Sequence, residues 1–394
     1  MERRDFIKLG LSAITAGCVS GIPPIFKVTE ALAARQTVIL NITEVFHQMV
    51  DETEVVYSWA YASPVTGPNI PGPVIFANDG ELLLIKVNNT LDEPHGLAIS
   101  GLFEGAFLVD SGPIPPGQSR TVAFPAPPPG TYLYQDPVNF PVNRVLGLHG
   151  VLVVMPRAAV NGNALTPYRD PTPEVQQLFN DLGNSAHFPS PGEPWKPERT
   201  TIWVFCEVDP VYNQMASLNQ PINPIDFVEN FLPRYFTING VSGYFGAGNT
   251  GTALKGMAGQ PRLIRNIHAG LGIHSPHIHA NHGYLLAVNN AQPTAALGGV
   301  FLVDTWSMAP GERRDILFPM IPPSDIPADT WARLKNGTST EGTGYTNPQH
   351  PGPRTTGFPL AYSMNSLLEL SQTAAGGNYP QGLMTHIEFE GTLV

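Results

Sequence analysis

Four histidines in the second half of the chain are the clearest candidates for chemistry, because they lie within nine residues of one another. They are His274, His277, His279 and His282. Imidazole binds copper, zinc and nickel, and a histidine pair with one neighbour can hold a single ion. On a regular strand His277 and His279 point to one side and the other two to the opposite side. A proline and a glycine in this segment permit a bend, so we predict a mononuclear metal site, with hydrogen-bonded histidines in a metal-free pocket as the alternative.

The other residues that could do chemistry are predicted to be structural. Cys206 lies in the apolar run 203–207, where a free cysteine usually behaves as a small buried hydrophobic residue. His95 and His149 are single histidines near turns and are interpreted as structural or solvated. The sequence contains no nucleophile elbow, phosphate-binding loop, dinucleotide fingerprint or zinc-protease helix. No other catalytic class is therefore indicated.

The elements that must position these residues are predicted to be strands. The 39 glycines, 41 prolines and 13% charged residues suit short strands joined by turns better than long surface helices. Apolar and β-branched runs occupy 37–42, 55–60, 81–88, 119–124, 131–134 and 150–155, and then 201–208, 235–239, 284–288, 315–318 and 384–390. We therefore predict an all-β fold of two antiparallel sandwiches.

The runs fall into two groups, which predicts two domains at residues 35–156 and 200–394. A segment rich in proline, glycine and asparagine, 157–199, connects them. It contains one predicted helix, with Thr172 as its cap, Pro173 in its first turn and Gly183 at its end. The turn at Pro115–Ser119 is similar to that at Ala309–Arg313, which indicates a weak internal repeat.

The N-terminus, residues 1–34, is interpreted as a twin-arginine export signal. Arg3-Arg4-Asp5-Phe6-Ile7-Lys8 precedes an apolar stretch and a small-residue cleavage site near Ala33. Cleavage would leave Cys206 as the single cysteine, so no internal disulfide is expected, and lipidation of Cys18 is the less favoured alternative. The predicted location is the periplasm or the cell surface. No other apolar run is long enough to span a membrane, and a net charge of -11 disfavours nucleic acid as a partner.

Several motifs occur in the order in which a known family carries them. They are Pro71–Ile75, Gly80–Leu82, Val87–Leu91, Ile114–Gln118, Gly130–Tyr134 and Gly147–Gly150 in the first half, and Phe236–Gly240, His274–His279 and Met308–Asp315 in the second. The chain resembles the multicopper oxidases, and in particular the two-domain laccases. The resemblance implies two Greek-key cupredoxin domains and a homotrimer. It also implies a copper held by two histidines and a cysteine, and three more coppers, held by eight histidines, that reduce O₂.

The chain departs from that pattern at most ligand positions. The first ligand pair falls on Ala98 and Ser100, and the second on Gln135 and Pro137. The C-terminal His-Cys-His motif and its following histidine fall on Asn365, Ser366, Leu367 and Ser371. Serine in place of the thiolate removes the ligand that defines a blue-copper site. Only His274, His277 and His279 match the family pattern.

The sequence thus predicts an exported member of this family that has lost its four-copper complement. It would bind mononuclear copper at the His274 cluster or serve as a scaffold. One alternative is a working laccase-like oxidoreductase that uses O₂, and another is a periplasmic protein that binds a protein partner without metal.

Overall fold

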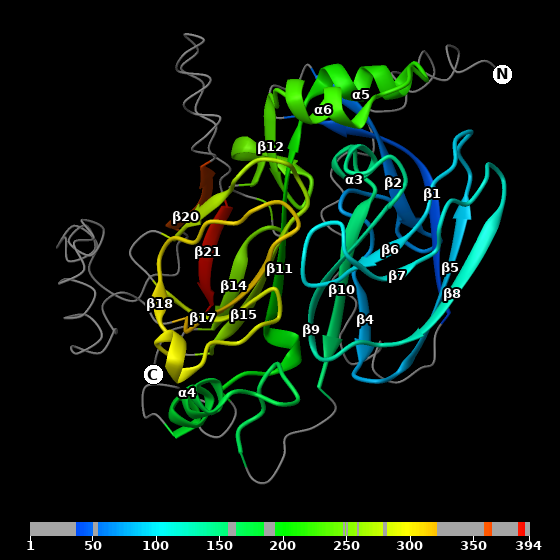
Figure 1. Cartoon of the computed structure of the whole chain (residues 1–394). Helices are drawn as coiled ribbons and strands as arrows, with labels where there is room; N and C mark the ends of the chain where they lie inside the picture. The colour runs from blue at the N-terminus through cyan, green and yellow to red at the C-terminus, as the bar shows by residue number, and fades with distance from the viewer. Residues whose placement is uncertain are drawn as a thin grey trace.

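The computed structural model describes residues 37–49, 54–156, 163–184, 194–246, 249, 251–257, 260–278, 282–320, 358–364 and 385–390. Their strands form four sheets, and helices are few and short, so the all-β prediction is confirmed. The sheets form two pairs, one built from residues 37–155 and one from residues 200–390 (Figure 1).

The first pair of sheets has five strands in each sheet. One has the order β3-β2-β1-β5-β8, with β1 Thr37–Gln48, β2 Val55–Ser63, β3 Gly67–Pro68, β5 Leu82–Asn89 and β8 Ser119–Pro125. The other has the order β4-β10-β9-β6-β7, with β4 Ile75–Asn78, β6 Ala98–Ser100, β7 Phe107–Asp110, β9 Gly130–Gln135 and β10 His149–Met155. Side chains alternate between buried and more exposed along β5, the pattern of a strand with one face on the core.

The second pair contains a seven-stranded and a four-stranded sheet. The larger has the order β13-β12-β11-β15-β19-β17-β18, with β11 Thr200–Val208, β12 Tyr235–Ile238, β13 Val241–Ser242, β15 Arg262–His268, β17 Gly283–Val288, β18 Leu302–Val303 and β19 Arg313–Phe318. The smaller has the order β14-β21-β20-β16, with β14 Leu254–Met257, β16 Ser275–His277, β20 Phe358–Met364 and β21 Thr385–Glu390.

Strand β10 lies between two hydrophobic cores and is buried along its whole length. Leu152 and Val154 pack in the core of the first sandwich. Val151 and Val153 point the other way, into a second core shared with β11, β15 and α4 (Pro173–Asn184). The two halves of the chain are therefore joined by an apolar interface and not only by the connecting segment.

The helix predicted at 172–183 is present as α4, and the Thr172 hydroxyl oxygen accepts a hydrogen bond from the Val175 amide at 3.4 Å. Two further helices were not predicted from the sequence: α5 (Pro210–Ser217) and α6 (Pro224–Asn230). Each begins with a proline behind an Asp209 or Asn223 cap, which is a recognisable start signal. Both lie over the first sandwich (Figure 1), and Asn213 of α5 donates to the Tyr57 carbonyl at 2.7 Å.

The remaining helical turns are short: α3 (Val142–Val145) and the 3-10 turns η2 (Pro197–Arg199), η3 (Gly243–Gly246) and η4 (Ala295–Leu297). None of the helices in the described part of the chain combines the length and apolar character needed to cross a bilayer.

A buried polar network also crosses between the halves. Asp315 of β19 accepts hydrogen bonds from the Thr131 hydroxyl at 2.7 Å, from the Arg265 guanidinium at 2.9 Å and from the Tyr168 hydroxyl at 2.9 Å. Thr131 belongs to β9, and Tyr168 belongs to the connection between the sandwiches. One carboxylate thus holds the first half, the connection and the second half together.

Candidate metal centre

The structure gives the predicted histidines different partners. His274 is buried, and its Nε2 lies 2.7 Å from Glu207 Oε1. His277 Nδ1 lies 2.6 Å from the Thr305 hydroxyl. His282 Nε2 lies 3.7 Å from a carboxylate oxygen of Asp304, and His279 is outside the described residues. His274 therefore faces the interior, while the contacts of His277 and His282 are with two consecutive residues of another segment.

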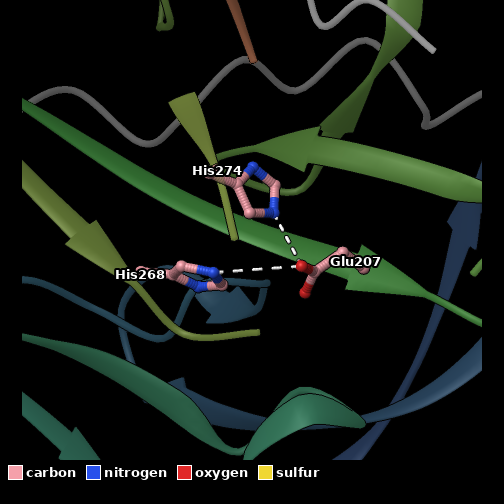
Figure 2. A group of neighbouring side chains, drawn as sticks. All are labelled: Glu207, His268 and His274. Atoms are coloured by element: carbon pink, nitrogen blue, oxygen red, sulfur yellow. Dashed lines mark hydrogen bonds and ion pairs between the residues drawn. The ribbon is translucent and has the colours of Figure 1, made fainter. Parts of the chain in front are cut away.

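A different set of residues gathers around His274. Glu207 near the end of β11, His268 at the end of β15 and His274 bring their potential ligand atoms within 4.8 Å of one another (Figure 2). The two imidazole rings lie 4.5 Å apart, nearly perpendicular. Strands β11 and β15 pair in parallel, with Phe205 beside His268, so both strands end at this point of the sheet. All three side chains are fully buried.

The carboxylate of Glu207 is enclosed by the loop that follows β15. Its Oε1 accepts hydrogen bonds from the Gly272 amide at 2.8 Å and from His274 Nε2 at 2.7 Å. Its Oε2 accepts from the Leu271 amide at 2.9 Å. A Cβ atom at Gly270 would lie 1.5 Å from Oε2, so only glycine permits this approach. The loop is therefore built around the carboxylate.

The hydrogen bonds of His268 fix the position of its proton. Its Nδ1 accepts from the Gly270 amide at 2.9 Å, so Nδ1 carries no hydrogen. Its Nε2 donates to the Gly272 carbonyl at 2.7 Å. His268 is therefore neutral, with the hydrogen on Nε2, which lies 3.9 Å from Glu207 Oε1.

Burial and charge set the protonation of this cluster. Burial alone would raise the pKa of Glu207, but the interactions with His274 and His268 and the loop amides outweigh it and hold the pKa at about 2. Burial, together with the charge of His274, lowers the pKa of His268 to about 3. At neutral pH the cluster thus contains a carboxylate and a neutral imidazole.

A carboxylate and two imidazoles are suitable donors for copper or zinc by residue type. Their hydrogen bonds do not suit a metal ion. Binding through His268 Nε2 would break its bond to Gly272 and move the hydrogen to Nδ1, where the Gly270 N–H already points. Both oxygens of Glu207 also have donors already. In this arrangement the cluster does not fit a metal ion.

Three of the aligned ligand positions in the first half lie side by side. Ala98 of β6 pairs directly with Gln135 of β9, and the Gln135 amide nitrogen lies 3.4 Å from the Ser100 hydroxyl. All three are buried, and Pro137 is half-buried just beyond β9. Asn365, Ser366, Leu367 and Ser371 lie outside the described residues. The strand before them, β20, ends at Met364 opposite Ser275, next to the histidine segment.

The single histidines and the cysteine are buried. His95 Nδ1 lies 2.7 Å from Asp136, which also accepts from the Asn143 side chain at 2.8 Å. His149 Nδ1 donates to the Arg144 carbonyl at 2.8 Å, and burial lowers its pKa to about 4. Cys206 is 3% exposed, as predicted, and burial strongly raises the pKa of its thiol.

Sequence reasoning missed Glu207 and His268. A signal was available, because a carboxylate inside an apolar strand requires buried partners. The sequence did not show which residues those partners were, since His274 is 67 residues from Glu207 along the chain.

Comparison with known proteins agrees with this fold. Residues 57–159 match the family model of the multicopper oxidases. Laccase-1 of Cryptococcus neoformans var. neoformans serotype D (strain B-3501A) is 34% identical over 111 residues, which are 24% of this chain and 18% of the laccase. The match thus spans less than a fifth of that laccase.

Solved structures with the same fold cover most of this chain. The blue copper oxidase from Nitrosomonas europaea is 19% identical, with 89% of this chain and 85% of that chain covered and a TM-score of 0.57. The copper nitrite reductase from the same organism is 15% identical, with coverages of 90% and 94% and a TM-score of 0.54. The fold defines the chain as a cupredoxin-type β-sandwich protein. The match to the multicopper oxidase family model is limited to the first sandwich and the residues just after it.

Proposed function

We propose that this chain is an exported cupredoxin scaffold of the multicopper oxidase family that does not perform the four-copper reduction of O₂. The supporting observation is the row formed by Ala98, Ser100 and Gln135. These buried positions align with the family's ligand pairs, yet a methyl group, a hydroxyl and an amide replace imidazoles. None of these groups can substitute for the nitrogen and sulfur ligands that select copper.

Export by the twin-arginine route to the periplasm or cell surface is part of this proposal, and its support is the paired arginine before an apolar stretch. A protein partner and a homotrimer are proposed from the family resemblance. The scaffold role is proposed because the described residues form both sandwiches while the residues aligned with ligands cannot bind copper, and function in such folds depends on the site and not on the fold itself.

A second candidate function is mononuclear copper binding by the outer histidines. It is favoured by the contacts of His277 and His282 with the consecutive residues Thr305 and Asp304, which place a hydroxyl beside one imidazole and a carboxylate near the other. His279 belongs to the same segment by sequence. This site would use a donor set different from the Glu207 cluster.

Oxygen uptake tests the first proposal. The mature protein, expressed with export and supplied with copper, is mixed with a phenolic dye in an oxygen electrode. We expect no O₂ consumption above that of free copper at the same concentration. Copper-dependent consumption that saturates with the dye would contradict the proposal and favour the laccase-like alternative.

Metal analysis tests the second candidate. The double variant His277→Gln/His282→Gln is compared with His187→Gln, a histidine distant in sequence from the cluster. If the outer histidines bind copper, the double variant loses about one equivalent and the control keeps it. Equal copper content in both variants and the wild type eliminates this candidate.

A further inference from the structure

Arg144 connects the first half of the chain to the loop that encloses Glu207. It lies in α3, and its side chain is fully buried. One guanidinium nitrogen donates to the Gly270 carbonyl at 3.0 Å, and another contacts the Glu104 carboxylate at 2.6 Å. The Gly270 carbonyl belongs to the loop that encloses Glu207. Arg144 therefore reaches the loop from the opposite sandwich.

A series of hydrogen bonds through the loop connects Arg144 to His274. The same glycine accepts from Arg144 through its carbonyl and donates to His268 through its amide. Gly272 accepts from His268 and donates to Glu207, which in turn binds His274. The backbone groups of Gly270 and Gly272 fix the roles of the two His268 nitrogens, because neutral imidazole has one donor and one acceptor.

The backbone of the loop at Gly270 also packs tightly against the Glu207 carboxylate. The position of a Cβ atom at Gly270 lies 1.5 Å from Glu207 Oε2 and 2.6 Å from its carboxyl carbon. The loop backbone thus rests on the carboxylate, and a metal ion there would have to displace the loop. A buried carboxylate requires paired charges or hydrogen bonds, and here the protein supplies both.

We propose that Arg144 ties the first sandwich to the loop that encloses Glu207, through its hydrogen bond to the Gly270 carbonyl. Together with Glu207, His268 and His274 it forms a metal-free lock between the two sandwiches. The lock holds the loop at 269–273 closed over Glu207 and ties α3 of the first half to that loop. This inference does not depend on the proposed scaffold function, since a lock of this kind could coexist with copper at the outer histidines.

The test compares thermal unfolding of the wild type with that of Arg144→Met and Arg144→Lys. Methionine keeps much of the side-chain length without charge or donors, and lysine restores the charge but not the two-pronged geometry. We expect the midpoint to fall by roughly 5 °C in Arg144→Met and by less in Arg144→Lys. Arg169→Met is the control, because Arg169 is an exposed arginine with carboxylate partners. Equal midpoints in Arg144→Met and Arg169→Met would overturn the lock.

Two measurements separate a lock from a general loss of packing. In hydrogen exchange, the amides of Gly270, Leu271 and Gly272 should exchange at least tenfold faster in Arg144→Met, while those of β1 and β5 are unchanged. In the wild type, adding EDTA or one equivalent of Cu²⁺ or Zn²⁺ should leave the exchange of these amides unchanged. Protection that requires added metal, and is lost in His274→Gln, would show a metal site and overturn the proposal even if Arg144→Met does not fold.

Discussion

At the scale of single residues, the buried histidines behave as hydrogen-bonding groups whose protonation is set by their surroundings. His268 and His149 each donate to a backbone carbonyl and are removed from water. Their environment favours the neutral ring, because removing a positive charge from water is costly and burial is the largest effect on both rings. His274, His277 and His282, which were predicted to bind metal, have polar partners as well. Residue type alone therefore did not separate ligands from structural groups.

These lowered pKa values predict that stability falls as the solution becomes acidic. The folded-state pKa is about 4 for His149 and about 3 for His268, both below the ordinary value of 6.5. The unfolded chain therefore binds protons more readily, so the contribution is complete above pH 6.5 and is lost as pH falls from 6.5 to about 4 for His149 and to about 3 for His268. We expect a loss on the order of 2 kcal/mol per histidine at pH 5.

Urea unfolding at pH 7.5 and at pH 5 measures this effect. The variant His149→Gln, which can still donate to the Arg144 carbonyl, should show a shallower decline than the wild type. A midpoint that is constant or rises as pH falls to 5 would show that these rings are not held neutral.

At the scale of elements, the loop between β15 and β16 is the decisive feature, since it turns two strand ends into an enclosed site. Gly270→Ala should be destabilising by about 2–3 kcal/mol, because the added methyl group overlaps the Glu207 carboxylate. Gly67→Ala is a matched control with open space around it and a φ of 72°, and should cost about 1 kcal/mol through backbone strain alone. Urea unfolding of both variants measures the difference, and equal losses would mean that the loop is not tightly packed on Glu207.

The elements themselves were largely predictable from sequence. Alternating runs such as that of β5 and the turn signals between them indicated strands in both halves. Helices α5 and α6 were not predicted, although Asp209-Pro210 and Asn223-Pro224 are good helix starts, because helices of 8 and 7 residues are too short to show a clear helical period. The resemblance aligned Ala98 and Gln135 with the family's first and second ligand pairs, and the structure places them opposite each other on β6 and β9.

The Glu207 cluster could not be predicted in the same way. Strand parity determines the side to which a residue points, but not which strand ends meet in space. Arg144 contacts a carbonyl 126 residues away, and Glu207 contacts a histidine 67 residues away. Such pairs depend on how the two sandwiches dock, and local sequence patterns carry little information about docking.

At the scale of the whole molecule, the two sandwiches are predicted to unfold together because Asp315 binds groups from both. Asp315→Asn leaves the buried Arg265 without its counter-charge and weakens the contacts to Thr131 and Tyr168. We expect a loss of about 3–5 kcal/mol. Asp170→Asn, at an exposed ion pair, should change stability by less than about 1 kcal/mol.

Calorimetry of these two variants tests whether the two sandwiches unfold together. The wild type and Asp170→Asn should each show one cooperative transition, and Asp315→Asn should show a lower midpoint or two separate transitions. An unchanged, single transition in Asp315→Asn would mean that the halves are coupled by the apolar interface alone.

The most direct test of the account is the copper stoichiometry of the mature protein after export in copper-supplemented medium, measured by elemental mass spectrometry together with its visible spectrum. The account predicts a colourless protein with about one copper per chain or none, because a methyl group, a hydroxyl and an amide stand at the positions that we propose correspond to the family's ligands. A blue protein that carries about four coppers per chain would contradict it.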